Sequence, residues 1–487
     1  MPQLPDLNLV PVLPEIIVAV TAILLLLLDA FRPARSQAPL LAISAAGLIG
    51  AAGPLIRAWR VPGEALTALG GMVAVDRYAI FFKMVILAVA LIGVLFSAHY
   101  FERTGDRRGE YYSLLLFATS GMMLLSAAAD LIVVFLALEV LSLSLYVMTG
   151  FSRTRLASQE ASLKYFLLGA FSSAFLLYGI AMAYGATGTT SLAGMADALS
   201  GETGSLTLAL TAAALLTVGF AFKVAAVPFH MWTPDVYQGA PTPVTGFMAA
   251  GTKVAGFAAL IRVASIGLGP LAWELTLAIA LLAVLTMFVG SILAIAQDDV
   301  KRMLAYSSIA HAGFVLVGVA AANHEGITGA MFYLVAYAAM ILGAFGVVIL
   351  VSRVGERRTS LASYRGLGRR SPLLAGLLTV FLLSLAGLPP TAGFLAKVFV
   401  FQAAVSAGLE WLVILAVIAS VIAAFFYLRV LVLTYMQDPE PSDASEGPET
   451  APVPGIAVAI AAGITILLGV IPGLILDPIQ TAGVLRW

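Results

Sequence analysis

Apolar segments of about 20 residues recur from one end of the 487-residue chain to the other, and a helix of that length crosses the roughly 30 Å hydrocarbon core of a bilayer. Only 11% of the residues are charged, against about 25% in soluble domains. The sequence therefore predicts an all-α membrane protein, because a helix satisfies its own backbone hydrogen bonds in lipid. We expect fourteen membrane spans, at residues 10–30, 38–56, 76–99, 111–128, 130–151, 160–185, 205–227, 241–264, 271–296, 302–321, 327–352, 372–402, 408–436 and 453–475.

The basic residues orient these spans. Most arginines lie in connections that follow odd-numbered spans, and the exceptions on the other side are Arg57, Arg60, Arg77 and Arg262. Positively charged connections tend to stay in the cytoplasm. We therefore expect the odd-to-even connections in the cytoplasm and both termini outside it. The first span lacks a basic leader and a small-residue cleavage site, so we expect a retained helix rather than a signal peptide.

Lysine is concentrated inside the apolar spans, whereas arginine lies mostly between them. Of the six lysines, only Lys301 lies in an obvious polar connection, and the other five are Lys83, Lys164, Lys223, Lys253 and Lys397. A desolvated lysine can give up its proton, which arginine in practice cannot do. This distribution indicates a chain that moves protons.

The five lysines differ in expected depth. Lys83 lies at the outer end of its span, where we expect its long side chain to extend to the membrane interface. Lys164, near the cytoplasmic end of its span, either does the same or faces the interior. Lys223, Lys253 and Lys397 lie deeper, so we expect them inside the protein.

Glu139 is an acidic residue in the middle of a span, within the run FLALEVL. An unpaired carboxylate at that depth is costly, so we expect it to face the bundle interior and a cationic partner. The pair could be a static clamp between helices. Five amines for one carboxylate exceed what a clamp requires, however, and some of them must be neutral or hydrated at pH 7. An amine between those states is what a proton relay needs.

Two spans contain breaks, at residues 228–234 (PFHMWTP) and 387–393 (GLPPTAG). Backbone freed in this way is tolerated only inside the protein or against a water-filled cavity. Both breaks lie beside the same pattern, glycine and phenylalanine preceding a lysine, which is Lys223 in one copy and Lys397 in the other. Paired broken helices indicate an internal repeat around a transport path. The alternative is an ordinary proline kink at each site.

His230 and His311 titrate nearest to physiological pH and could pass protons along a wet path, or either could be a neutral packing histidine. The four histidines are scattered, so no metal site is indicated. The chain has no cysteine and a formal net charge of zero. Those two facts exclude thiolate-bound iron–sulfur clusters and argue against nucleic-acid binding. No nucleotide or quinone site emerges.

Two long motifs carry a family resemblance. Residues 221–235 (AFKVAAVPFHMWTPD) and 297–311 (QDDVKRMLAYSSIAH) resemble the proton-translocating, antiporter-like subunits of respiratory complex I. Shorter motifs at 110–112 (EYY), 160–166 (EASLKYF) and 387–390 (GLPP) favour the subunit N family of bacterial NADH:quinone oxidoreductases. The resemblance covers about residues 75 to 436. Subunit M-like members usually have a glutamate where this chain has Lys397.

The resemblance implies two inverted five-helix repeats, spans 4–8 and 9–13, with spans 7 and 12 broken. The corresponding units are residues 1–100 (an initial three-helix segment), 101–265 and 266–436 (the two repeats) and 437–487 (an acidic loop and the last helix).

The resemblance also implies roles for single residues. Glu139 and Lys223 would form an acid–base pair in the cytoplasmic half-channel, Lys253 the central relay and Lys397 the group that passes protons outward. Three further residues would extend the hydrated path: Lys164, His230 and His311.

By the same resemblance the chain is a translocating subunit of an enzyme of the bacterial cell membrane and performs no redox chemistry itself. It would bind no cofactor, while NAD, FMN, iron–sulfur clusters and quinone would belong to partner subunits. Its expected partners are M-like and K-like membrane subunits and the lipid bilayer. The alternatives are a subunit of an Mrp-type cation/proton antiporter or of a membrane-bound hydrogenase, and a structural spacer between pumping neighbours.

Overall fold

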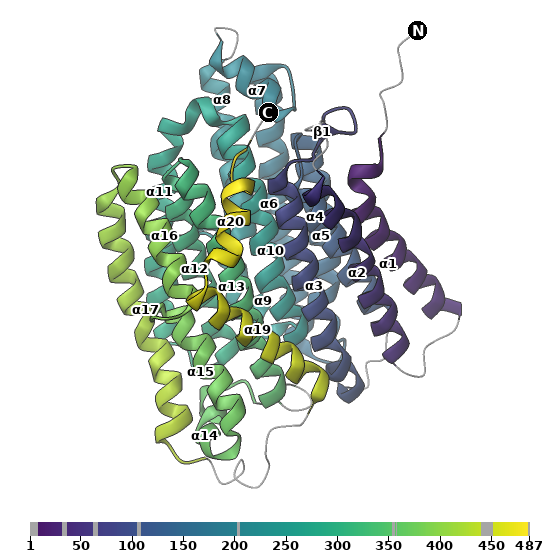
Figure 1. Ribbon diagram of the computed structural model, residues 1–487, viewed down its shortest axis with the longest axis vertical. Coiled ribbons are helices and arrows are strands. Elements are labelled where there is room, and N and C mark those ends of the chain that lie inside the picture. The colour runs from purple at the N-terminus through teal and green to yellow at the C-terminus, as the bar shows by residue number, and fades with distance from the viewer. Residues whose placement is uncertain are drawn as a thin grey trace.

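The structure is a computed structural model that describes residues 8–31, 37–61, 67–104, 109–201, 205–352, 356, 358–439 and 451–485. Long helices run side by side through it (Figure 1). Most of the predicted acidic loop, residues 440–450, lies outside the described residues. So do six arginines that contributed to the predicted orientation: Arg32, Arg35, Arg107, Arg108, Arg353 and Arg357.

The helices follow one another with short connections. In chain order they are η1 (Val10–Val12), α1 (Leu13–Phe31), α2 (Ala38–Arg60), α3 (Arg77–Thr104), α4 (Glu110–Ser126), α5 (Leu131–Thr149), α6 (Leu156–Thr187), α7 (Leu192–Ser200), α8 (Leu206–Val224), α9 (Trp232–Gly239), α10 (Thr242–Arg262), η2 (Val263–Gly267), η3 (Gly269–Leu271), α11 (Ala272–Ile295), α12 (Val300–Ala320), α13 (His324–Val351), η4 (Leu361–Tyr364), α14 (Leu367–Arg370), α15 (Pro372–Ala386), α16 (Ala392–Ser406), α17 (Glu410–Met436), α19 (Pro452–Val470) and α20 (Gly473–Ala482).

Helices occupy all fourteen predicted segments. Within the described part of the chain, 12 helices are long and apolar enough to cross a membrane. The fourth predicted span is α4, which has 17 residues. The twelfth is divided into α15 and α16, of 15 residues each. The all-α membrane fold class is confirmed, while the number of crossings remains a prediction.

A small β-hairpin between α2 and α3 departs from the helical expectation. Its strands, β1 (Thr67–Ala68) and β2 (Val73–Ala74), pair in antiparallel register. The chain reverses through left-handed backbone at Leu69, Gly70 and Gly71, with φ of 52°, 67° and 94°, and glycine adopts such angles without strain. Backbone hydrogen bonds of 2.7 and 2.9 Å attach the hairpin to the connection between α4 and α5. Strands of two residues are too short to produce a detectable alternation.

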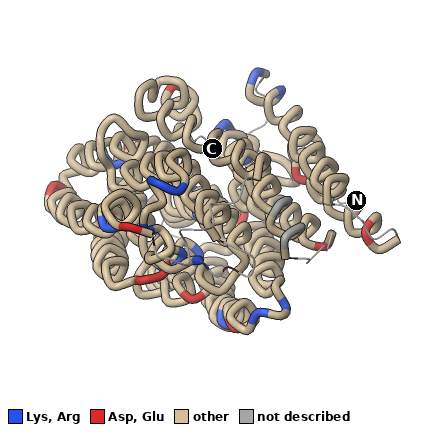
Figure 2. Tube along the Cα trace, turned by 90° about the horizontal axis from the view of Figure 1, so that it is seen from below, with Lys and Arg blue, Asp and Glu red and all other residues tan. Residues whose placement is uncertain are grey.

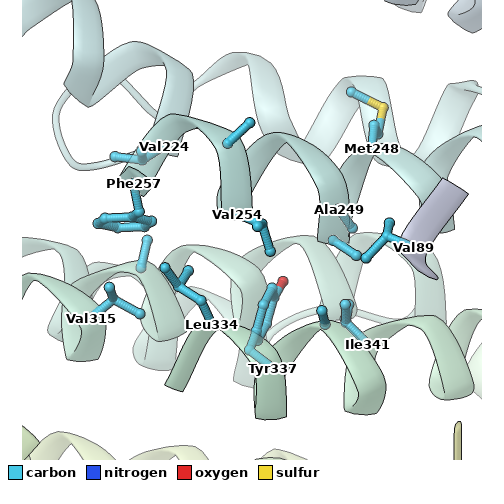
Figure 3. Packing of buried hydrophobic residues seen from close by; sticks show 14 of the residues in the cluster. Val89, Val224, Met248, Ala249, Val254, Phe257, Val315, Leu334, Tyr337 and Ile341 are labelled. Atoms are coloured by element: carbon cyan, nitrogen blue, oxygen red, sulfur yellow. The ribbon is translucent and has the colours of Figure 1, made fainter. Parts of the chain in front are cut away.

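The centre of the bundle consists of α10, α12 and α13, whose most apolar windows are entirely buried. A helix that is apolar on every side is typical of such an interior position. Figure 3 shows Val254 and Phe257 of α10 facing Leu334 and Tyr337 of α13. Charged residues are sparse along the bundle (Figure 2). Two of these three central helices, α10 and α12, contribute Lys253 and His311 to this interior.

One capped connection occurs twice in the fold. Asp130 precedes α5, accepts a backbone N–H from its first turn at 2.8 Å, and accepts the Thr190 hydroxyl at 2.8 Å. Asp299 precedes α12 and does the same, at 2.9 Å to a backbone N–H and 2.6 Å to the Thr359 hydroxyl. Both partners are displaced by the same 169 residues, from 130 to 299 and from 190 to 359.

A close helix contact repeats with the same spacing. A Cβ on Gly121 would lie 2.8 Å from the Leu141 nitrogen, so α4 and α5 touch backbone to backbone there. A Cβ on Gly290 would lie 2.5 Å from the Ala310 nitrogen, where α11 meets α12. Gly121 and Gly290, like Leu141 and Ala310, are 169 residues apart. These matches support an internal repeat, and the inverted arrangement of its two copies remains a prediction.

Both predicted helix breaks are present. The first separates α8, which ends at Val224, from α9, which begins at Trp232. The second separates α15, ending at Ala386, from α16, beginning at Ala392. The residues after the two ends, Ala225 and Gly387, have left-handed backbone (φ 58° and 86°). Each break leaves the last carbonyls of a helix without an intrahelical partner.

Candidate functional site: buried amines at two broken helices

Lys223 is the penultimate residue of α8, immediately before the first break. Its side chain is buried, and Nζ donates to the Ser142 hydroxyl of α5 at 2.8 Å. The ring of Tyr165 lies 5.9 Å from the amine. The predicted interior position of Lys223 is therefore present, and its immediate partner is a hydroxyl group.

Glu139 lies one helical turn before Ser142 on α5 and is half-buried. Its Oε1 accepts a short hydrogen bond from the Ser173 hydroxyl of α6. No ion pair joins Glu139 to Lys223, although the structure describes both residues. The two predicted partners, Glu139 and Lys223, thus do not touch. Each instead forms a hydrogen bond with a serine.

A cavity of about 10 Å³ lies beside these serines, lined in part by Ser142, Ser173 and Lys223. A buried water needs roughly that volume together with several polar partners. The cavity therefore has room for one water between the hydroxyl that contacts Glu139 and the amine of Lys223. Such a water would join the two charges without a direct contact.

Lys253 is at the centre of the bundle, on α10. The side chain is buried, and Nζ donates to the carbonyl of Val224, the last residue of α8, and to the carbonyl of Ser308 on α12 at 3.2 Å. Helix C-terminal carbonyls are electronegative and attract cations. The break after Val224 therefore creates the binding place of this amine, one residue from Lys223.

His311 is held by two tyrosines. Its Nδ1 lies 2.7 Å from the Tyr333 hydroxyl and its Nε2 lies 3.1 Å from the Tyr427 hydroxyl, while Tyr427 also contacts Ser307 at 2.5 Å. Hydroxyl and imidazole groups both donate and accept hydrogen bonds. The four side chains form a continuous series in the second half of the bundle. Tyr427 was not predicted, because a tyrosine in an apolar helix carries no distinctive signal.

Lys397 lies on α16, which begins after the second break. It is buried, and Nζ donates to the carbonyl of Ala386, the last residue of α15, at 2.8 Å and to the Ser420 hydroxyl at 2.7 Å. The ring of Phe314 lies 4.8 Å away. Lys253 and Lys397 thus share one arrangement, in which an amine binds the last carbonyl of a helix that stops inside the protein.

This chain is similar to known proteins along most of its length. Residues 128–423 match the family model described as "NADH:quinone oxidoreductase/Mrp antiporter, TM". The "NADH-quinone oxidoreductase subunit N" of Trichlorobacter lovleyi is 46% identical over 477 residues, covering 98% of this chain and 97% of that protein. This chain belongs to the subunit N family of NADH-quinone oxidoreductases. The predicted family resemblance is confirmed.

Two solved structures are similar to this chain over nearly its whole length. A chain of respiratory complex I from Thermus thermophilus with bound aureothin is 38% identical, with a TM-score of 0.81, and the match covers 96% of this chain and 99% of that one. A chain of the Mrp complex from Dietzia sp. has a TM-score of 0.86 at 22% identity, with 97% of both chains covered. The second likeness concerns the fold alone.

Two predicted site residues of this subunit N family member do not join the buried series. Lys164 is 43% exposed and pairs with Glu160 and Asp235, each at 2.8 Å. Asp235, on α9, also binds Arg302 at 2.6 Å. His230 lies in the connection before α9 and is partly exposed; its Nδ1 is buried and has no hydrogen-bond partner among the described residues. Both residues lie at the edge of the site.

The prediction that Lys83 extends to the membrane interface is wrong. Only 3% of its surface is exposed, and its Nζ lies 2.7 Å from Glu15 Oε1 of α1. The sequence indicated an interface position because Lys83 lies near the outer end of its span. It gave no sign that α1 packs nearby and presents a buried carboxylate. This pair is separate from the series that contains Lys253.

Lys301, expected in a polar connection, is buried in an ion cluster. Its Nζ contacts Glu356 at 2.6 Å, and Arg155 contacts the same carboxylate at 3.2 Å. Tyr100 donates to Glu356 at 2.8 Å, and the backbone N–H of Thr242 donates at 2.6 Å. Glu356 therefore ties four other segments together at the start of the central helix α10. Its position in a connection between two predicted spans gave no sign of this burial.

Among the described residues, no group of three or more histidine, aspartate or glutamate side chains could hold a metal ion. The polar side chains from Glu139 to Lys397 are one carboxylate, three lysine amines, one imidazole and several serine and tyrosine hydroxyls. Amines have no lone pair to offer while they are protonated. The chemistry that this arrangement supports is the transfer and holding of protons.

Proposed function

We propose that this chain moves protons across the membrane as a subunit of an NADH-quinone oxidoreductase, along the buried series from Glu139 to Lys397. The observation that carries the proposal is the shared arrangement of Lys253 and Lys397, each bound to the last carbonyl of a broken helix. Half-helix ends inside membrane proteins recur at ion and proton sites. The relationship to subunit N proteins and to a chain of respiratory complex I supports the assignment.

The path has an entrance, a centre and an exit. Glu139, Ser173, Ser142 and Lys223 form the first part, where the small cavity lies. The second part is the amine of Lys253, bound at the end of α8. Where no hydrogen bond joins one group of the path to the next, water or movement of the flexible lysine side chains must carry the proton.

The exit half has hydroxyl and imidazole groups that can hand a proton on. Ser307, Tyr427, His311 and Tyr333 are joined by hydrogen bonds. A proton that leaves Lys253 near the Ser308 carbonyl reaches this series on the same helix, α12. Lys397 and Ser420 lie beyond it.

The driving step would be a change in the distance between Glu139 and Lys223. When the distance between a cation and a carboxylate grows from about 4 to about 8 Å, their attraction weakens by about 2 kcal/mol at an effective dielectric constant of about 20. That is roughly a thirtyfold change in the protonation equilibrium of the amine. A helix movement in this assembled enzyme could therefore push a proton from Lys223 toward Lys253.

The redox steps would take place elsewhere in the enzyme. NADH oxidation, iron–sulfur and flavin chemistry and quinone reduction would belong to partner subunits, and this chain would contact M-like and K-like membrane neighbours. Lys164, Asp235 and Arg302 would form a charged surface near the cytoplasmic entrance, where a cavity of about 390 Å³ lies between the α6 and α9 segments.

Replacing Lys253 by methionine tests the central position. We expect proton transfer through this chain to fall by about 100-fold or more, because a positioned acid–base group is lost. The measurement is the number of protons pumped per NADH oxidised by the purified complex in liposomes. Thr252→Val is the matched control, since the adjacent hydroxyl only bonds back to Met248 within α10. Unchanged pumping by an assembled Lys253→Met complex would rule out the proposed centre.

The predicted orientation can be tested with single cysteines, because the chain has none of its own. Ser200, at the end of α7, and Asp438, after α17, are both exposed. If both termini lie outside, a membrane-impermeant maleimide should label Ser200→Cys in intact spheroplasts. Asp438→Cys should be labelled only after the membrane is permeabilised. The reverse pattern would invert the orientation.

A further inference from the structure

An apolar groove runs along the outside of α3. The side chains that line it come from α2, α3, α13, α19 and α20, its volume is about 470 Å³, and all of its lining side chains are apolar. Trp59 lies at one end and Ile92 at the other, with Leu342 and Ile475 on the facing helices. We call it the α3 groove. It is separate from the series of buried lysines.

The α3 groove has the depth of one membrane leaflet. Its lining on α3 extends from Phe81 to Ile92, which is about 17 Å at a rise of 1.5 Å per residue. Half of the hydrocarbon core is about 15 Å. A chain that enters from one membrane surface therefore reaches the bilayer centre when it fills the groove.

The α3 groove offers a volume of about 470 Å³ along about 17 Å of α3. A single extended hydrocarbon chain fits a space of that length and volume. The alternative occupant is a helix of a neighbouring subunit that covers the groove, and the cross-linking experiment below distinguishes the two.

Trp59, which lines the α3 groove, has three arginines near it in the sequence or in space. Arg57 and Arg60 lie in the last turn of α2 beside Trp59, and both are exposed. The guanidinium of Arg77, at the start of α3, lies 5.6 Å from the centre of the Trp59 ring. None of the three forms an ion pair with a described residue. Tryptophan is enriched at the headgroup level of membranes.

These arginines are also exceptions to the charge distribution of the chain. They lie on the side that has few basic residues, together with Arg262. Arg262 differs from them, since it is buried and makes a two-pronged ion pair with Asp76, at 2.8 Å for both contacts. Arginine binds phosphate oxygens in the same two-pronged way. The exposed Arg57 and Arg60 and the partly buried Arg77 thus complement an anion near Trp59.

We propose that the α3 groove binds one acyl chain of an anionic phospholipid, whose phosphate is held by Arg57, Arg60 and Arg77. The acyl tail fills the α3 groove, and Trp59 lies at the boundary between the tail and the headgroup. Under the predicted orientation this lipid belongs to the outer leaflet. The site does not depend on the proton path.

The test uses the assembled complex in liposomes that contain a photoactivatable phospholipid with a diazirine near the middle of one tail. Phosphatidylglycerol is the anionic probe and phosphatidylcholine the neutral one. After illumination, mass spectrometry maps the labelled peptides. We expect the anionic probe to label peptides that contain residues 81–92 and 464–478 about tenfold more than the neutral probe, because the arginines attract the net negative charge that only the anionic probe carries.

Two variants separate the parts of the proposal. The triple variant Arg57→Gln, Arg60→Gln and Arg77→Gln should lower labelling by the anionic probe to the neutral level, while the exposed Arg369→Gln should leave it unchanged. Ala88→Trp, at an exposed groove position, should block both probes. Equal labelling by the two probes, labelling that survives Ala88→Trp, or cross-linking of the groove to a neighbouring subunit in place of lipid would overturn the proposal.

Discussion

Proton pumping coupled to NADH oxidation should fall to the same low level when Lys223 is replaced by arginine as when it is replaced by alanine. Lys223 is buried, and its amine is bound to the Ser142 hydroxyl. Arginine keeps the positive charge but in practice does not release its proton, whereas lysine can. If Lys223 must lose its proton in every cycle, both variants should reduce transfer through this chain by about 100-fold or more.

The arginine variant distinguishes the relay from a structural clamp. A static charge opposite Glu139 would be preserved by arginine, and Lys223→Arg would then pump normally while Lys223→Ala would not. The measurement is protons per NADH in liposomes, with the amount of assembled complex measured in parallel. Thr211→Val, on the exposed face of the same helix, is the matched control. Normal pumping by Lys223→Arg would show that deprotonation is not required.

The long helices could be predicted because composition alone determines them. An apolar segment of about 20 residues in lipid has few options other than a helix. The short elements could not be predicted, because α7, α9, α14 and the hairpin are too short to be stable without tertiary contacts. The hairpin, for example, is attached by backbone hydrogen bonds to a connection that follows it by more than 50 residues.

The site was predictable where a residue type is unusual in its surroundings. Lys223, Lys253 and Lys397 stand out as amines in apolar helices, and the prolines mark the breaks that bind two of them. What the sequence did not contain is which helices are neighbours. That is why Ser142 was missed as the direct contact of Lys223, and why Glu15 was missed as the partner of Lys83.

Replacing Glu356 by glutamine should have the largest effect on stability. The carboxylate is buried between Lys301 and Arg155, at 2.6 and 3.2 Å. Breaking a buried ion pair by removing one partner typically costs about 3–5 kcal/mol, because the remaining charge is left uncompensated. We expect much less of the chain in the assembled complex, measured by quantitative mass spectrometry of purified membranes. Asp438→Asn, which removes a largely exposed partner of Arg369, should change nothing.

A double variant and the pH dependence of stability show whether the lost ion pair causes the instability of Glu356→Gln. Lys301→Met added to Glu356→Gln should restore much of the lost assembly, because replacing both members of a buried pair is often nearly neutral. Burial alone would raise the pKa of Glu356, but the nearby Lys301 and Arg155 outweigh it and hold that pKa below the usual 4.5. The carboxylate therefore stabilises the fold at neutral pH, and that contribution is lost as the pH falls below about 4.5 through the lowered pKa. Glu356→Gln should lack this acid-dependent loss in thermal melting of the purified complex, and an unchanged acid profile would assign the instability to other groups.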